Sequence, residues 1–257
     1  MSEQRDTFDQ VAGLYDRVRP TAPAEALEAL WRGLEVAPGA RVLEVGCGTG
    51  QLTLDLLGRG AHVHAIEPGA ALAEVIQQKT AGQPFTLEVA SFESAAIEHE
   101  AFEAVAASQA AHWVPRDAFL DQTARAIGVG RHLALLWHLD ISQDTDFYRA
   151  TQPLYDRHLP DADTRPPRTL PDHLAAYEAA LEADTRFARA PTARWPWTRT
   201  FDTEGYLRML QTHSPVRMLD EAARSAFLAG HHEVLESFGG EIDRFYETVL
   251  VLATRVA

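Results

Sequence analysis

The sequence predicts an α/β fold built on a mostly parallel sheet of seven strands, with helices on both faces. Three observations lead to this prediction. Short apolar runs that suit buried strands alternate with stretches of helical spacing between residues 41 and 139. The first of these runs ends in glycines, as buried strands do where they turn into a helix. The 257 residues are enough for one large domain or two small ones with a sizeable core.

The first 35 residues are predicted to be helical. Apolar residues from Phe8 to Val18 recur at spacings near 3 and 4, which is typical of one helix face. Arg19-Pro20 ends that helix, because proline disfavours helical backbone in the residue before it. A second helix is predicted over 23–34, followed by a turn at Pro38-Gly39.

Five strands and three helices are then predicted in alternation. The strand ranges are 41–46, 62–67, 85–90, 102–108 and 132–139, and the helix ranges are 51–57, 70–79 and 116–127. Strands that alternate with helices of this kind form βαβ units, in which the strands lie parallel in one sheet.

The alternation stops near Asp140. Residues 141–186 hold five prolines among short helical stretches. This segment is much longer than an ordinary connection of about 2–6 residues, so we predict an inserted helical cap. Strands over 187–201 and 246–253 complete the seven, with a helix capped by Asp202 and another over 219–237 between them. The prediction is a single domain over residues 1–257, with its core at about 36–140 and 187–257.

Composition excludes several classes of protein. The chain has 23 Lys and Arg against 37 Asp and Glu, a net charge of −14, so a nucleic-acid partner is not expected. No apolar run approaches the ~18 residues of a membrane span, and the polar start lacks a secretory signal. We therefore expect a cytoplasmic protein without an integral membrane segment. Cys47 is the only cysteine, which excludes an internal disulfide. Nothing in the sequence indicates the oligomeric state.

Residues 44–50, Glu-Val-Gly-Cys-Gly-Thr-Gly, carry the clearest chemical signal. Glycine at a strand-to-helix turn lets the backbone approach a ligand closely, because no Cβ intrudes. The third glycine of the dinucleotide fingerprint would fall on Gln51, which disfavours NAD and FAD. Glu67 ends the next strand, where a carboxylate can accept both ribose hydroxyls of a nucleoside. The sequence shows no phosphate-binding loop and no lysine near this turn, so the site suits a nucleoside without phosphates.

Residues 42–50 resemble motif I of the class I S-adenosylmethionine-dependent methyltransferases, whose fold is Rossmann-like. Residues 66–68, Ile-Glu-Pro, resemble the acidic position after the family's second strand, and residues 90–93 fall in its adenine slot. Residues 107–113, Ala-Ser-Gln-Ala-Ala-His-Trp, are similar to the S-A-Q-A-aromatic-H-W stretch of a small-molecule subgroup. The order Ala107-Ser108 and the small Ala111 depart from that stretch, beside the expected methyl position.

The same subgroup has an N-terminal Y-x-x-x-R-P lid, which Tyr15 and Arg19-Pro20 resemble, and residues 245–250 resemble its last strand. The resemblance implies S-adenosylmethionine as cofactor, a small-molecule methyl acceptor and helices over 1–35 that close over the site. The cofactor-binding residues that it implies are Tyr15, Arg19, Glu44, Gly46, Cys47, Gly48, Gly50, Glu67, Pro68, Ser91, Phe92, Ser108, Gln109 and Trp113. No metal ion is expected.

Three alternatives stay open. One is a cofactor-binding protein of the same fold without transfer activity. Another is a quinone or lipid C-methyltransferase, in which the cap takes a hydrophobic tail. The third is a nicotinamide dehydrogenase, which Gln51 disfavours.

His112 is the candidate catalytic residue, because it follows the fourth strand at the edge of the sheet where open α/β folds bind ligands. Histidine titrates near neutral pH, so a general base, a hydrogen-bond donor to the substrate and a structural residue are all open roles. His138, at the end of the fifth strand, is a weaker candidate. Of the paired histidines, we predict that His62 and His64 pack on a strand and that residues 231–232 lie on a helix surface.

Overall fold

The computed structural model describes residues 21–141, 145–160 and 172–257. The predicted first helix, and Tyr15 and Arg19 with it, lie outside the described residues.

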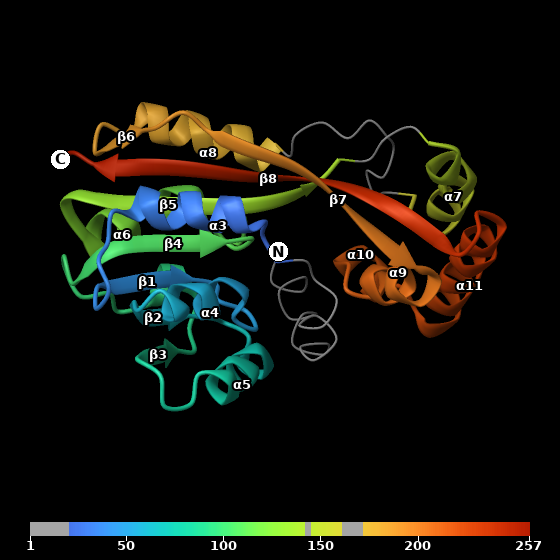
Figure 1. The fold of residues 1–257 in the computed structure, drawn as a ribbon, viewed down its shortest axis with the longest axis horizontal. Coiled ribbons are helices and arrows are strands. Elements are labelled where there is room, and N and C mark those ends of the chain that lie inside the picture. Colours follow the sequence, from blue (N-terminus) through green and yellow to red (C-terminus); the bar gives the residue numbers. More distant parts are fainter. Residues whose placement is uncertain (1–20, 142–144, 161–171) are drawn as a thin grey trace.

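One twisted sheet organises the molecule (Figure 1). Its strands are β1 (Arg41–Val45), β2 (His62–Ile66), β3 (Phe85–Glu88), β4 (Phe102–Ser108), β5 (Ile127–Asp140), β6 (Phe187–Arg189), β7 (Ala193–Asp202) and β8 (Glu241–Arg255). The strand order is β3-β2-β1-β4-β5-β8-β6, and β7 also pairs with β8. Neighbours among β1 to β5 are parallel, whereas β8 runs antiparallel to β5, β6 and β7. The predicted α/β fold with a mostly parallel sheet is confirmed.

The strand predicted over 187–201 is two strands in the structure, which makes eight strands rather than seven. Both pair with β8, but the register shifts by one residue between them: Arg189 faces Ala253, and Ala193 faces Leu250. Pro191 lies in the gap and has no N–H for the ladder, which favours a break or bulge at this point. Because β6 and β7 share one side of β8, the sheet keeps the predicted width of seven strands.

Helices cover both faces of the sheet. They are α3 (Ala24–Leu34), α4 (Gln51–Gly58), α5 (Ala70–Lys79), α6 (Arg116–Ala126), α7 (Asp146–His158), α8 (Asp172–Ala183), α9 (Thr203–Leu210), α10 (Ser214–Arg217) and α11 (Glu221–Ser237), with the short 3-10 helices η1 (Phe92–Ser94) and η2 (Ala111–Trp113). Leu30 of α3 and Leu56 of α4 belong to the core cluster on one face, and Phe119 of α6 belongs to the cluster on the other. Asp202 caps α9 as predicted, accepting a hydrogen bond from the Gly205 N–H at 2.6 Å.

The segment predicted as a cap, 141–186, reaches two different parts of the molecule. Leu174, Tyr177 and Leu181 of α8 are fully or almost fully buried against the sheet, in the same core cluster as α6. Helix α7 instead packs with α9, α10 and α11 around Phe147 and Phe227. These four helices form a second lobe of the molecule. Figure 1 shows this lobe where β7 ends and β8 begins, away from the parallel strands.

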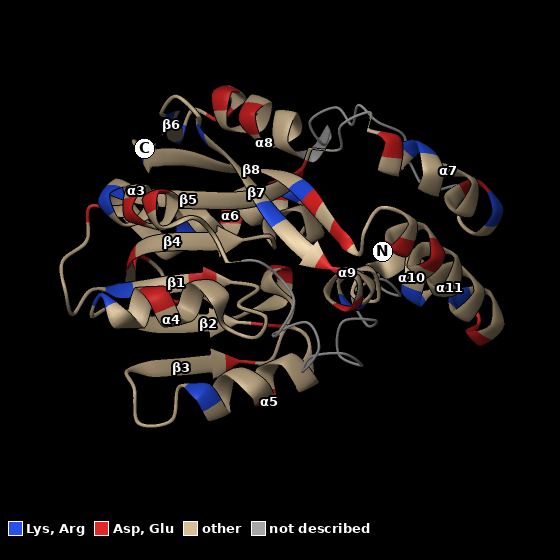
Figure 2. Ribbon diagram, turned by 45° about the vertical axis from the view of Figure 1, so that its right-hand side comes forward, with Lys and Arg blue, Asp and Glu red and all other residues tan. Residues whose placement is uncertain are grey.

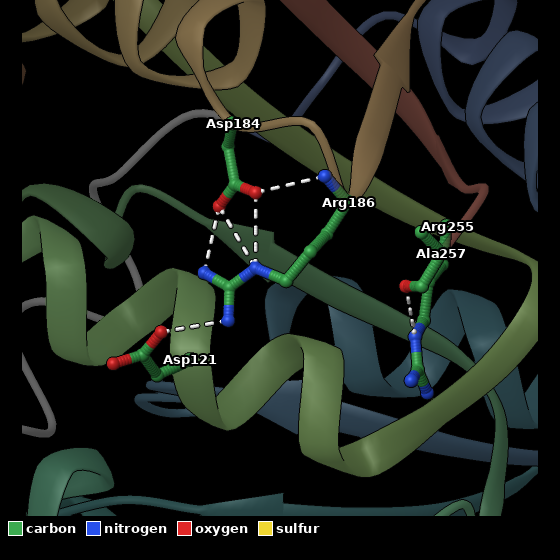
Figure 3. A network of polar contacts seen from close by, with 5 residues as sticks. All are labelled: Asp121, Asp184, Arg186, Arg255 and Ala257. Atoms are coloured by element: carbon green, nitrogen blue, oxygen red, sulfur yellow. Dashed lines mark hydrogen bonds and ion pairs between the residues drawn. The ribbon is translucent and has the colours of Figure 1, made fainter.

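Arginine side chains help to hold both parts to the rest of the molecule. Arg186, just after α8, contacts Asp184 at 2.7 Å and Asp121 of α6 at 2.8 Å (Figure 3). At the other end, Arg244 of β8 is 3% exposed, pairs with Asp140 of β5 and donates to the Tyr206 hydroxyl of α9 at 3.0 Å. The second lobe is therefore joined to the sheet by a hydrogen bond from the Arg244 guanidinium as well as by the two strands.

The predicted surface position of His231 is wrong. Its side chain is fully buried, Nδ1 is 2.9 Å from the Phe227 carbonyl oxygen, and its ring centroid lies 5.3 Å from that of Tyr155. Consecutive residues of a helix point in different directions, so α11 buries His231 while His232 is exposed. Burial lowers the pKa of His231 to about 4.

The described surface carries both signs of charge. In Figure 2, both acidic and basic residues lie on β7 and β8, where Arg194 pairs with Glu247 at 2.6 Å. Among the described residues, no helix has the length and apolar character that crossing a membrane requires.

Candidate functional site

The glycine turn after β1 has a backbone that only glycine adopts easily. Gly46, Gly48 and Gly50 have φ values of +68°, +55° and +97°. A Cβ at Gly46 would lie 2.4 Å from the Ala110 Cβ, and one at Gly50 would lie 2.1 Å from the Ile76 side chain. A Cβ at Gly48 would meet nothing closer than 4.0 Å. The turn is thus wedged between α5 and the end of β4, and it leaves room beside Gly48.

Glu67 lies beneath this turn, at the end of β2. It is 5% exposed, and its two carboxylate oxygens accept hydrogen bonds from the Gly48 and Gly69 backbone N–H groups, each at 2.9 Å. These charge-assisted bonds hold the carboxylate in one orientation. Pro68, between Glu67 and Gly69, is exposed. The structure therefore brings together the turn and the carboxylate that the sequence singled out.

Glu44 and Cys47 are buried within the same turn. Burial raises the pKa of Glu44 to about 7, the neighbouring Glu67 carboxylate adds to that rise, and a 2.6 Å hydrogen bond from the Thr53 hydroxyl opposes it. Burial also raises the pKa of the Cys47 thiol, with Glu44 and Glu67 adding to the effect. A thiolate is therefore disfavoured at Cys47.

Lys79 also reaches this turn, although the sequence placed no lysine near it. Its Nζ donates to the Thr49 carbonyl oxygen at 2.9 Å from the end of α5, 30 residues along the chain. The Gln51 side chain donates to the Thr49 hydroxyl at 2.8 Å. Both side chains thus stabilise the turn itself, a role for which the sequence held no signal.

The end of β4 forms the opposite side of the site. Gln109 has a φ of +56°, its N–H donates to the Leu136 carbonyl oxygen at 2.9 Å, and its side chain donates to the His138 carbonyl oxygen at 3.0 Å. Ser108 and Trp113 are half-buried on either side of it. This turn is therefore anchored to β5 and meets the glycine turn where Gly46 faces Ala110.

His112 is held by residues that sequence analysis did not connect to it. The Trp137 indole N–H of β5 donates to His112 Nδ1 at 3.2 Å, and Trp137 is 1% exposed. The Tyr177 hydroxyl of α8 donates to the Ala111 carbonyl oxygen at 2.6 Å, which fixes the backbone of the same turn. His138 instead lies 2.9 Å from the Thr248 hydroxyl.

The remaining predicted positions follow β3. The hydroxyl group of Ser91, just before η1, lies 2.8 Å from that of Ser94, the last residue of η1. The Phe92 side chain is 3% exposed and contacts Phe119 in the core, with ring centroids 5.4 Å apart, so this side chain belongs to the core.

His64 of β2 lies 2.7 Å from the Thr86 hydroxyl of the neighbouring strand β3. The described residues contain no group of three or more His, Cys, Asp or Glu that could hold a metal ion.

Known proteins resemble this chain in sequence and in fold. Residues 42–130 match the family model of a methyltransferase domain. Residues 42–130 therefore resemble a methyltransferase domain. An uncharacterized methyltransferase of Mycobacterium tuberculosis is 34% identical over 133 residues, which is 51% of this chain and 52% of that protein. The chain thus spans about half the length of the curated relatives that it matches.

Solved structures agree with this methyltransferase fold. A candidate type II methyltransferase from Anaeromyxobacter dehalogenans has a TM-score of 0.68 at 21% identity, covering 92% of this chain and 97% of that one. A geranyl diphosphate C-methyltransferase from Streptomyces coelicolor, solved with Mg²⁺, geranyl diphosphate and S-adenosyl-L-homocysteine, has a TM-score of 0.51 at 16% identity, covering 91% and 79%. At these identities the likeness concerns the fold alone.

Proposed function

We propose that this methyltransferase domain uses S-adenosylmethionine and transfers its methyl group to a small-molecule acceptor. The observation that carries the proposal is Glu67, a buried carboxylate fixed by two glycine N–H groups at the end of β2. Such a carboxylate can accept both hydroxyls of a ribose. The similarly folded Streptomyces enzyme, solved with S-adenosyl-L-homocysteine, supports the choice of cofactor.

The residues around Glu67 fit this cofactor. The open space beside Gly48 suits the methionine part, which approaches backbone closely. Ser91 and the Phe92 backbone border the adenine in this proposal, and Ser108, Gln109 and Trp113 lie on the methyl side. Tyr15 and Arg19, which the resemblance also implies for cofactor binding, lie outside the described residues.

When bound, the cofactor supplies a methyl group on a sulfonium that is already an activated leaving group. The acceptor's lone pair forms a bond to the methyl carbon while the carbon–sulfur bond breaks, and sulfur keeps the electron pair. The chain's task is to align the two reactants, which can contribute about 7–11 kcal/mol. A base is needed only for an acceptor that must lose a proton.

Cofactor binding is tested by thermal shift and calorimetry with S-adenosylmethionine, S-adenosylhomocysteine and NAD. At 100-fold excess over Kd, a ligand adds about 2.7 kcal/mol to stability, which raises Tm by about 5–10 °C for a chain of this size. Glu67→Gln should weaken the first two ligands by about 10- to 100-fold, because hydrogen bonds to a charged group are lost. Glu103→Gln is the matched control, since Glu103 accepts a hydrogen bond from the Arg41 N–H at the other end of the strands, where β1 and β4 begin. A response to NAD alone would instead support a dehydrogenase.

Transfer is tested separately, by the release of S-adenosylhomocysteine with benzoate, catechol, thiophenol and benzylamine as probes. Product with one of them separates an enzyme from a protein that only binds the cofactor. If only ubiquinone analogues react, the methyl acceptor is a lipid or a quinone. We expect EDTA to leave cofactor binding unchanged, and loss of binding in EDTA would contradict the metal-free site.

A further inference from the structure

His112 follows Ala111 in the turn after β4, and its hydrogen bond to Trp137 decides which of its nitrogens carries the proton. The indole N–H of Trp137 is a donor and has no acceptor function. It lies 3.2 Å from His112 Nδ1, so Nδ1 must present its lone pair. A neutral imidazole holds one proton, which is therefore on Nε2.

The surroundings keep this arrangement in place. Trp137 is 1% exposed, and its ring lies 5.6 Å from that of Tyr177, so the indole cannot turn away without disturbing the core. Tyr177 in turn holds the Ala111 carbonyl oxygen beside His112. The ring nitrogen and the backbone of this turn are thus held from two elements, β5 and α8, that are far from His112 in sequence.

We infer that His112 acts as a hydrogen-bond donor to the methyl acceptor through its Nε2–H, with Trp137 as the positioning residue that sets this tautomer. This inference rests on the proposed function. A nitrogen that already carries a proton is no base, so His112 keeps its proton throughout the transfer. The acceptors that suit the site arrive with an unprotonated nucleophile that has more than one lone pair, such as a carboxylate or a thiolate. One lone pair accepts the Nε2–H bond while another attacks the methyl carbon.

The tautomer is measured directly, without cofactor, by long-range ¹H–¹⁵N NMR of the protein labelled in its 11 histidines. The signals that disappear in His112→Gln identify the residue. We expect the Nε2–H tautomer in the wild type and a mixture of tautomers in Trp137→Phe, which keeps an aromatic ring but lacks the N–H. Trp113→Phe is the control, because its ring also lies beside His112, at 4.9 Å, and its loss leaves the Trp137 bond in place. The Nδ1–H tautomer in the wild type, or an unchanged tautomer in Trp137→Phe, overturns the inference.

The role in transfer is measured on the probe acceptor that releases the most S-adenosylhomocysteine. Gln retains an N–H donor but is no base. We expect His112→Gln to keep kcat/KM within about tenfold of the wild type and His112→Ala to fall below it. A loss of about 10²–10⁴-fold in both variants is the signature of a general base and overturns the inference. If no probe reacts, the proposed function loses support, while the NMR experiment still decides the tautomer.

Discussion

Gly46→Ala tests whether the glycine turn is shaped by contact with β4 as well as by its own backbone. Residues other than glycine lose about 1–2 kcal/mol in left-handed backbone, and Gly46 has a φ of +68°. The new methyl would also lie 2.4 Å from the Ala110 Cβ, although ordinary contacts begin at 3.4 Å. Overpacking of that kind costs about 1–3 kcal/mol, so we expect a total loss of about 2–5 kcal/mol.

Two further variants separate these contributions in urea unfolding followed by circular dichroism. Gly39→Ala should lose stability through the backbone conformation alone, because Gly39 has a φ of +91° and no atom lies within 4 Å of its new Cβ. It should lose about 1–2 kcal/mol. Ala110→Gly removes the methyl that Gly46→Ala meets, so the double variant should recover about 1–3 kcal/mol beyond additivity. If Gly46→Ala is no less stable than Gly39→Ala, or if Ala110→Gly gives no recovery, the contact between the two turns does not shape the site.

Three more variants test the energetics of the fold. Arg186→Gln should lower the free energy of unfolding by less than about 1 kcal/mol, because the Arg186 side chain is 38% exposed and screened by water; a loss above about 2 kcal/mol would contradict this. The pKa of Glu44 is raised from 4.5 to about 7, so between these pH values the folded chain holds a proton that the unfolded chain has lost. Stability should therefore fall as pH rises through this window, on the order of 1 kcal/mol per pH unit, and the difference between wild type and Glu44→Gln in urea titrations should show it; a difference that is constant with pH refutes it. His231 has the opposite sign: its pKa is lowered from 6.5 to about 4, so its contribution to stability is lost as pH falls through that window. His231→Phe should be less sensitive to acid than the wild type between pH 6.5 and 4 in thermal unfolding, and equal sensitivity would show that His231 is not buried in the neutral form.

Local patterns were enough for most strands of the sheet and for the position of Glu67. The apolar pattern of residues 102–108 predicted β4 at its observed bounds. The glycines at 46, 48 and 50 predicted the turn, because glycine has no Cβ and adopts positive φ values easily. The position of Glu67 followed from the parallel sheet, since strands β1 and β2 end at one edge and the turn after β1 must lie over the end of β2. Each of these predictions depends on neighbours within a few residues or on a rule that holds for all parallel sheets.

Other features depend on which surfaces meet, and no local pattern encodes that. The bond from Trp137 to His112 spans 25 residues and the bond from Tyr177 to Ala111 spans 66, so both exist only because β5 and α8 fold against the end of β4. The same holds for the burial of His231, which requires the second lobe to close around one face of α11. Periodicity shows that a helix or strand has an apolar side. Which segment covers that side is decided by packing between parts of the chain that are distant in sequence, and the same packing sets the tautomer of His112.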